Sequence, residues 1–242
     1  MNRIDNYNLL IVYLITLGVL LGSSQNSIAI MFGQVDDFQD NTTQGWGSGG
    51  GNPNPPLQVP DGGPLGLRTG DGYLQIEANS NTSGPGTRLT AIAGSQWTGD
   101  YLDEGVTAIS ADVNNFSGTA FELRLLFGDG NSAEGSPGNS VWSANSISVP
   151  AASGWRSILF PIESTDLTGP GDPTSILGDV LEMRLFHNIN SGFPGQQGAG
   201  ILGIDNITAV SSAVIPEPST VGFFLIVLTS IYGFSRRKTF KI

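Results

Sequence analysis

Short apolar runs, separated by Gly-, Pro- and Asn-rich turns, follow one another from residue 35 to residue 210 and constrain the fold more than any other feature. In runs such as "YLQIEA", which begins at Tyr73, apolar and polar residues alternate, so that Leu74, Ile76 and Ala78 share one face of a strand. No run keeps a helical period for longer than about two turns. The pattern therefore predicts an all-β fold, a two-sheet antiparallel sandwich. The runs begin near residues 35, 73, 87, 106, 121, 141, 155, 181 and 200.

Residues 45–72 interrupt this pattern with ten Gly and five Pro, including "GSGGGNPNPP". This composition argues against a helix and against a central strand. Loops of this length in a compact domain either carry function or are poorly ordered, and here we expect a poorly ordered loop. The whole segment 30–213 is long enough for one domain with a core of its own.

The amino terminus has the three parts of a secretory signal. Arg3 precedes the apolar stretch 9–21, and Ser27 and Ala29 place small residues at the two positions that a signal peptidase reads. We therefore expect residues 1–29 to form a signal helix that directs the chain out of the cytoplasm and is removed by signal peptidase. The alternative is an uncleaved amino-terminal anchor, and with either reading the middle of the chain lies outside the cytoplasmic membrane.

The carboxyl terminus, residues 214–242, combines a Pro-Glu-Pro sequence with an apolar run and a basic cluster. The apolar run, residues 221–234, would extend roughly 21 Å as a helix, which is short against a hydrocarbon core of about 30 Å. The basic cluster that follows favours the cytoplasmic side of a membrane. The residues that define these features are Pro216, Glu217, Pro218, Arg236, Arg237 and Lys238.

These three features, in this order, resemble the PEP-CTERM sorting signal of exported bacterial proteins. The resemblance implies transient anchoring in the inner membrane by the short apolar helix, recognition by an exosortase-type processing enzyme near Pro-Glu-Pro, and removal of the tail. It also implies delivery to the outer cell surface or the extracellular matrix, so that the chain meets a membrane only through its terminal segments. A plain tail anchor is the alternative.

The charge of the segment between the two signals is strongly acidic. Residues 30–218 carry 20 Asp and Glu against five Arg and no Lys, a net charge of −15. Such a surface repels phosphate and excludes nucleic acid as a partner, whereas it is compatible with neutral polysaccharides and divalent cations. Cysteine is absent, which excludes a catalytic thiol and a disulfide framework.

Two of the expected strands share an apolar-acid-apolar-Arg-Leu pattern, "FELRL" and "LEMRL". Because side chains alternate along a strand, Glu122 and Arg124 lie on one face of the first, and Glu182 and Arg184 on one face of the second. If the two strands are neighbours, these residues form a Glu/Arg ladder on the polar face of the sheet. The ladder is either a solvated surface feature or a binding face whose Arg and Glu contact sugar hydroxyls.

The first and last expected strands, "VDDFQDNTTQGW" and "GILGIDNITAV", together with "GWRSILFPI", resemble galactose-binding-like jelly rolls, a group that includes many carbohydrate-binding modules. The resemblance implies a jelly-roll sandwich and a structural calcium ion between the first and last strands. Asp37 and Asp205 are the positions that match, and carboxylates are ligands that calcium prefers. The alternative is that Asp205 accepts turn hydrogen bonds beside Asn206.

Tryptophan side chains are the usual platforms for sugar rings, since they combine an apolar face with a polar edge. Trp142 lies among small polar residues in "SVWSANS", which makes it the best candidate for an exposed platform. Trp97, beside Tyr101 in "GSQWTGDY", is the second candidate.

Catalytic chemistry has little support in the sequence. The single histidine, His187, falls on the expected core face, so no Ser-His-Asp arrangement can be built around it. Glu122 and Glu182 are the one pair of carboxylates that we nominate for glycoside hydrolysis, although each lies two residues from an Arg that favours its ionised form.

The sequence thus predicts an exported, non-enzymatic jelly-roll protein of the cell surface or extracellular matrix that binds polysaccharide through one sheet face. The first alternative is a purely structural matrix protein stabilised by calcium, and the second is a secreted polysaccharide hydrolase or lyase.

Overall fold

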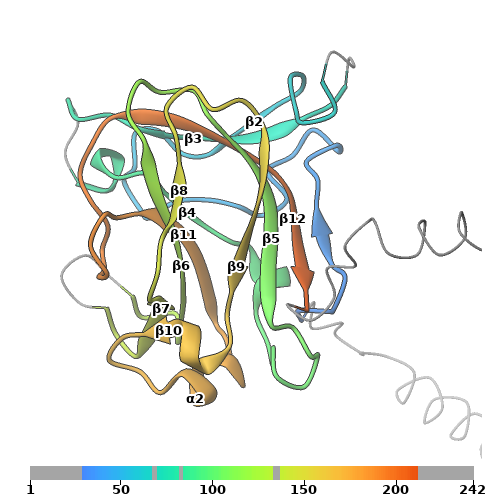
Figure 1. Ribbon diagram of the computed structural model, residues 1–242, viewed down its shortest axis with the longest axis vertical. Helices are drawn as coiled ribbons and strands as arrows, with labels where there is room; N and C mark the ends of the chain where they lie inside the picture. Colours follow the sequence, from blue (N-terminus) through green and yellow to red (C-terminus); the bar gives the residue numbers. More distant parts are fainter. Residues whose placement is uncertain (1–28, 67–69, 82–83, 133–136, 212–242) are drawn as a thin grey trace, which may run out of the picture.

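The computed structural model describes residues 29–66, 70–81, 84–132 and 137–211, and the two predicted terminal signals lie outside this part of the chain. The described residues form two facing antiparallel β-sheets (Figure 1). Within the described ranges, no helix is long and apolar enough to cross a membrane.

The first sheet has the strand order β2-β3-β12-β5-β9, and β1 pairs with the far part of β12. All of its pairings are antiparallel. Its strands are β1 (Val35–Asp36), β2 (Leu57–Val59), β3 (Tyr73–Ala78), β5 (Ala108–Asn115), β9 (Arg156–Pro161) and β12 (Gly200–Val210).

The second sheet has the order β10-β7-β6-β11-β4, and β8 pairs with the first residues of β6. It is also antiparallel throughout. Its strands are β4 (Thr90–Ile92), β6 (Phe121–Gly128), β7 (Ser140–Ser143), β8 (Ile147–Val149), β10 (Leu167–Thr168) and β11 (Glu182–His187). The short helices are η1 (Gly84–Thr87), η2 (Ser95–Trp97), η3 (Ser164–Asp166) and α2 (Pro173–Leu177).

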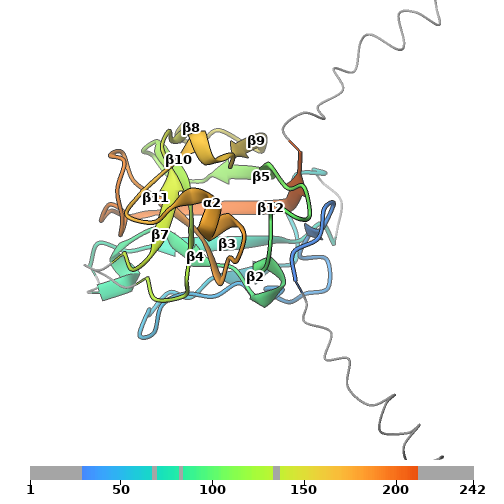
Figure 2. The same cartoon turned by 90° about the horizontal axis from the view of Figure 1, so that it is seen from below.

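Eight of these strands divide into two four-stranded halves, β3-β12-β5-β9 and β4-β11-β6-β7, between which the chain passes repeatedly. Eight strands in two facing antiparallel sheets are the arrangement of a double-sheet jelly roll. The predicted two-sheet antiparallel sandwich is therefore confirmed. Because β1 pairs with β12, with Val35 opposite Thr208, the chain enters and leaves the sandwich at the same end (Figures 1 and 2).

The core lies between the sheets and follows the alternation of the sequence. Leu74 and Ile76 of β3 are buried in the same core cluster as Leu123, Leu125 and Phe127 of β6, on the strand faces that the period-two pattern predicts. Burial of side chains of this size contributes about 1.5–3 kcal/mol each, which in a chain without cysteine is the main source of stability.

Two segments differ from the expectation. The Gly/Pro-rich segment 45–72 contains an edge strand, β2, and a buried tryptophan, Trp46, so much of it is ordered against the sandwich. The run "VWSANSISV" is two strands, β7 and β8, and at the break between them the guanidinium of Arg124 donates to the carbonyls of Ser143 and Ala144 at 2.7 and 2.8 Å.

Candidate functional site

The outward-facing side of the second sheet holds most of the predicted ligand-binding residues. Strands β6 and β11 are neighbours, which was the condition for the Glu/Arg ladder, with Arg184 of β11 opposite Leu126 of β6 on one side and Ile92 of β4 on the other. Trp142 of β7 is opposite Leu126, so Leu126 lies between Arg184 and Trp142 on this face.

Arg184 is held rigidly on this face. Its Nε donates to Oε1 of Glu182 at 2.7 Å, its terminal nitrogen also contacts that oxygen, and the same nitrogen donates to the Ser132 carbonyl at 3.2 Å. The guanidinium carbon lies 5.0 Å from the ring centroid of Phe193, which is a cation–π distance. The exposed fraction of the Arg184 side chain is 13% and that of Glu182 is 7%. Arg184 is thus preorganised, since its side chain is already ordered and loses little further conformational entropy when a ligand binds.

A hollow of about 260 Å³ opens beside Arg184, and we call it the face groove. Its walls come from β4, from β11 and from the β11–β12 loop that crosses the sheet face. The residues that define it here are Arg88, Thr90, Ile92, Arg184, Phe193 and Pro194. The groove therefore combines two basic side chains with an aromatic ring and a proline ring.

Trp142 is half-buried, and its indole N–H donates to the Ser191 hydroxyl at 3.3 Å. Ser191 belongs to the β11–β12 loop, as Phe193 does, so this loop meets Trp142 on one side and Arg184 on the other. The part of the indole that the loop leaves uncovered faces outward, and its role as a sugar platform stays a prediction.

Arg124 does not serve a binding face, and that expectation is wrong. It is 4% exposed, and its guanidinium donates to the backbone carbonyls of residues 143, 144 and 188, with residue 189 at 3.5 Å. All its donors point into loops that fold over the sheet, so it joins the β7–β8 turn to the β11–β12 loop. Strand alternation correctly placed Arg124 on the outer face, but it gave no sign that loops would cover it.

The predicted Glu/Arg ladder does not form, because the two strands are offset. Arg124 is opposite Phe186, and Glu182 is opposite Gly128. Glu122 instead accepts the Ser146 hydroxyl at 2.7 Å, and Glu182 pairs with Arg184 of its own strand.

The same offset separates the two carboxylates that we nominated for hydrolysis. Glu122 and the residue opposite Glu182 are six positions apart on β6, or about 20 Å at the rise of a strand. Paired carboxylates of glycosidases lie about 5–9.5 Å apart. Glu122 and Glu182 are therefore too far apart to act on one glycosidic bond.

Trp97 is not a platform, and that prediction is also wrong. Its side chain is fully buried, and its indole N–H donates to Oδ2 of Asp36 at 2.6 Å. The same oxygen accepts the indole N–H of Trp46 at 2.7 Å and the amide of Gln96 at 3.0 Å. The two indoles lie edge to face, with ring centroids 6.5 Å apart, around one buried carboxylate.

Asp205 lies in a β-bulge of β12, where the register shifts between Asp205 and Thr208 and Asn206 has a positive φ of 50°. Oδ1 of Asp205 accepts the N–H of Asn206 at 2.8 Å, as the alternative turn interpretation predicted. Its other oxygen, Oδ2, is buried and has no hydrogen-bond partner among the described residues. Burial, and then the negative charges of Asp71, Asp112 and Asp37, raise the pKa of Asp205 to about 7.

The orphaned oxygen of Asp205 fits the chemistry of a cation ligand, and the negative charge of Asp37 contributes to the raised pKa of Asp205. Asp37 itself accepts the Gln39 N–H and the Gln44 amide, both at 3.2 Å. In the described ranges, no three acidic or histidine side chains are grouped as metal ligands. A cation here would therefore need backbone carbonyls or water to complete its shell, which calcium accepts.

The sequence analysis did not predict an aromatic cluster on the outer face of the first sheet. Tyr73, Phe116 and Trp155 meet there, with ring centroids 5.3–6.4 Å apart, and Trp155 donates to the Gly62 carbonyl at 2.8 Å. Gly203 lies beneath them, and a Cβ there would be 2.9 Å from both Phe116 and Trp155. A glycine inside the strand pattern "GILGID" is the signal of close packing that was available.

No known protein family and no curated protein matches the sequence. The fold is similar to that of a family 11 carbohydrate-binding module from Clostridium thermocellum, in complex with a beta-1,3-1,4-mixed-linked tetrasaccharide. The identity is 18% and the TM-score 0.45, over 75% of this chain and 96% of the module. It is also similar to part of an exo-beta-agarase, with 14% identity and a TM-score of 0.48 over 71% of this chain and 24% of that one.

A third similar structure is the K2 cleaved adhesin domain of Lys-gingipain, with 11% identity and a TM-score of 0.40 over 72% of this chain and 97% of that one. All three TM-scores are below 0.5. These likenesses therefore do not bear on function, which has to be inferred from the residues of this chain.

Proposed function

We propose that the protein is an exported, non-enzymatic protein that binds a neutral polysaccharide along the outer face of its second sheet. One observation carries the proposal: Arg184 is fixed by Glu182 and Phe193 at the wall of a groove on that face. A guanidinium held in place donates to sugar hydroxyls without losing side-chain freedom, and the ring of Phe193 offers an apolar surface to the C–H face of a sugar.

A neutral glycan suits the charge of the protein better than an acidic one. The strongly acidic segment between the two signals repels uronic and sulfated polymers, and the basic pair Arg88 and Arg184 is local to the groove. Trp142 lies on the far side of the buried Leu126 from Arg184, two strand spacings or about 10 Å away, so a ligand that contacts both has to extend beyond a single sugar ring.

The terminal signals supply the location in this proposal. A signal peptide would export the chain, and the PEP-CTERM-like tail would hold it in the inner membrane until an exosortase-type enzyme releases it to the cell surface or matrix. The sorting motif from Pro216 to Pro218 is the part to test, by following the mass and location of the exported protein after Glu217→Ala.

A second candidate function is purely structural: a matrix protein that calcium stabilises through Asp37 and Asp205. The orphaned Oδ2 of Asp205 favours it. The two candidates share the same calcium proposal and differ only in whether the sheet face takes a glycan.

The test is glycan binding by the purified protein, with soluble mixed-linkage glucan, xylan and agarose as neutral probes and alginate as an acidic one, in calcium and then in EDTA. Phe193→Ala and Trp142→Ala should each weaken binding to the neutral polymer about tenfold, which corresponds to about 1.4 kcal/mol.

Trp155→Ala is the matched control, because Trp155 is also half-buried but directly precedes β9 of the other sheet. A folded protein that binds none of the neutral probes, or that loses binding with Trp155→Ala alone, would contradict the proposed face. A melting temperature that calcium still raises would then favour the structural role.

A further inference from the structure

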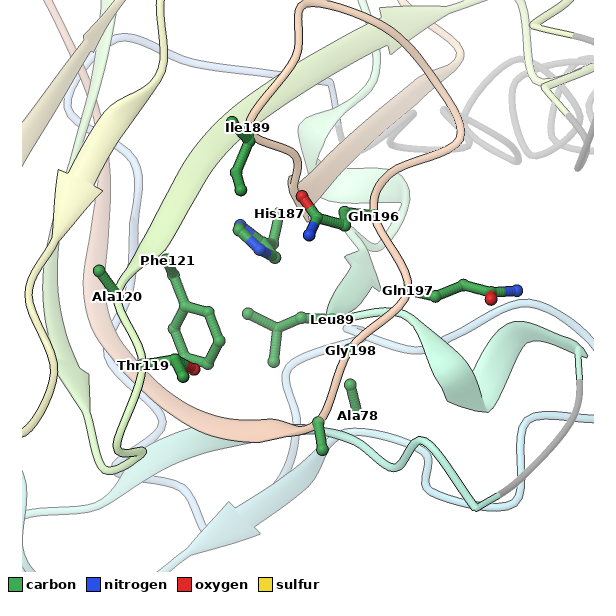
Figure 3. A pocket seen from close by; sticks show the side chains of 11 residues that line it. Ala78, Leu89, Thr119, Ala120, Phe121, His187, Ile189, Gln196, Gln197 and Gly198 are labelled. Atoms are coloured by element: carbon green, nitrogen blue, oxygen red, sulfur yellow. The ribbon is translucent and has the colours of Figure 1, made fainter.

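A second and larger hollow lies at one end of the sandwich, between the two sheets. It opens where β3 and β11 end and where β6 and β12 begin, and its volume is about 490 Å³. We call it the end pocket, and its main lining residues are Ala78, Leu89, Phe121, His187, Ile189 and Gln196. Figure 3 shows the ring of His187 and the amide of Gln196 turned toward the pocket, above Phe121 and Leu89.

His187 gives this pocket a hydrogen-bonding group, which a mere gap in the packing of apolar side chains would not have. Its side chain is only 8% exposed, and its Nδ1 lies 2.9 Å from the backbone N–H of Glu122. The carbonyl of Glu122 is 3.1 Å away, but it already accepts the N–H of Asn188 at 2.8 Å. Nδ1 is therefore the acceptor of the Glu122 N–H, which places the proton of the neutral ring on Nε2.

The Nε2–H of His187 has no acceptor among the described residues, although its ring is almost entirely buried. Burial lowers the pKa of His187, so the ring is neutral at pH 7 and keeps this single donor. The ring is largely buried, but Nε2 is not among the described polar atoms that are fully buried without a partner, so this donor is open to the pocket, where water or a ligand accepts from it. The pocket into which His187 projects is the one place from which a partner can come.

The rest of the lining restricts the ligand. Among the described residues, no Asp, Glu, Lys or Arg lines the pocket, in a protein whose central segment is strongly acidic. Phe121 and Leu89 form an apolar floor, whereas His187 and Gln196 supply hydrogen bonds at one edge. A volume of this size lies at the lower end of the range for small-molecule sites, roughly 300–1,000 Å³.

We propose that the end pocket binds a terminal neutral pyranose ring of a glycan. A pyranose has an apolar C–H face for Phe121 and Leu89, and hydroxyl oxygens at its edge that accept from the Nε2–H of His187. The site is separate from the face groove but rests on the proposed function in that its ligand is again a glycan. The β11–β12 loop contributes Phe193 to the groove and Gln196 to the pocket, so one loop lies between the two.

The test uses the single histidine of the chain as the reporter. Methyl β-glucopyranoside and methyl β-galactopyranoside are titrated into protein labelled with ¹⁵N-histidine, and the imidazole resonances are followed by NMR. At least one glycoside should shift the Nε2 signal of His187 in a saturable way. Methyl β-glucuronoside, which adds one negative charge to the same ring, should bind about tenfold more weakly or worse.

Ala199→Trp is the blocking variant, because Ala199 is exposed at the rim and a larger side chain there fills the pocket without entering the core. It should abolish the shift of His187, while Trp142→Ala should leave it unchanged. No saturable shift with either glycoside, or a shift that persists in Ala199→Trp, would overturn the end pocket. Loss of polymer binding in Phe193→Ala with the His187 shift intact would separate the two sites, so that each can fail alone.

Discussion

The indole N–H of Trp97 donates to Oδ2 of Asp36 over 2.6 Å, and neither side chain is more than 5% exposed. Asp36 belongs to β1, whereas Trp97 is the last residue of the short helix η2, which follows β4 in the chain. This contact therefore joins the first strand to the connection after β4. Trp46 and Gln96 donate to the same oxygen, so one buried carboxylate holds three side chains of the amino-terminal part of the fold together.

Replacement of Asp36 by Ala should therefore destabilise the protein strongly. The variant leaves two buried indole donors without an acceptor, and we expect a loss of about 2–5 kcal/mol in the free energy of unfolding. Asp36→Asn keeps one acceptor oxygen and should cost less. Urea unfolding followed by tryptophan fluorescence measures both, with Asp103→Ala, at an exposed site, as the control. Equal stability of Asp36→Ala and Asp103→Ala would contradict this role.

Arg124 should stabilise the loops that cover the second sheet and should not contribute directly to glycan binding. Arg124→Met keeps the length of the side chain but leaves the carbonyls of residues 143, 144 and 188 without their donor, and we expect a loss of about 2–4 kcal/mol. Because these carbonyls belong to the β7–β8 turn and the β11–β12 loop, hydrogen exchange should rise in both loops. Arg156→Met, at an exposed Arg of β9, is the control and should change neither quantity.

Much of the fold could be predicted because apolar side chains alternate along most of the strands. Strands β3 and β12 have the bounds Tyr73–Ala78 and Gly200–Val210, the same residues as the runs that the sequence singles out. The side of each strand that faces the core was also predictable, as Leu123, Leu125 and Phe127 show. These are local properties, and a local pattern is sufficient for them.

The candidate site was less predictable because it depends on what lies across each strand and above it. The offset that separates Glu122 from Glu182 is a matter of register, which the repeated "FELRL" and "LEMRL" patterns do not encode. Arg124 and Trp97 are covered by segments distant in sequence. The alternation of residues along a strand does not show which distant segments cover it, so both residues resembled surface positions in the sequence.

The aromatic cluster on the first sheet should tolerate no side chain at Gly203. In Gly203→Ala, the new Cβ would lie 2.9 Å from Phe116 and Trp155 and 3.1 Å from Tyr73, and we expect a loss of about 1–3 kcal/mol from overpacking. The half-exposed ring of Phe116 can be removed, so Phe116→Ala in the same chain should recover part of the loss. Gly118→Ala is the control, because nothing lies within 4 Å of a Cβ there. Thermal unfolding of Gly203→Ala, of Phe116→Ala and of the double variant measures the coupling. A neutral Gly203→Ala would show that the cluster is loosely packed.

Asp205 should make the stability of the protein fall as the pH rises from about 4 to about 7. Its pKa in the folded protein is about 7, against an ordinary value of 3.8, so over this interval the folded state holds a proton that the unfolded state has lost. The contribution of this proton to the free energy of unfolding is complete below pH 3.8 and is lost as the pH rises through 7. Between the two pKa values the free energy of unfolding falls by at most about 1.4 kcal/mol for each pH unit.

Asp205→Asn has no such proton to lose, so its stability relative to the parent protein should rise with pH across this interval and level off above pH 7. Urea unfolding at pH 4 to 8 in EDTA measures the difference, with Asp103→Asn as the exposed control. Calcium at pH 8 should stabilise the parent protein, because the cation replaces the lost proton at the orphaned Oδ2, and should leave Asp205→Asn unchanged. A parent protein and an Asp205→Asn variant that respond equally to calcium would exclude Asp205 as a calcium ligand, while an absent pH trend would show that water reaches its carboxylate.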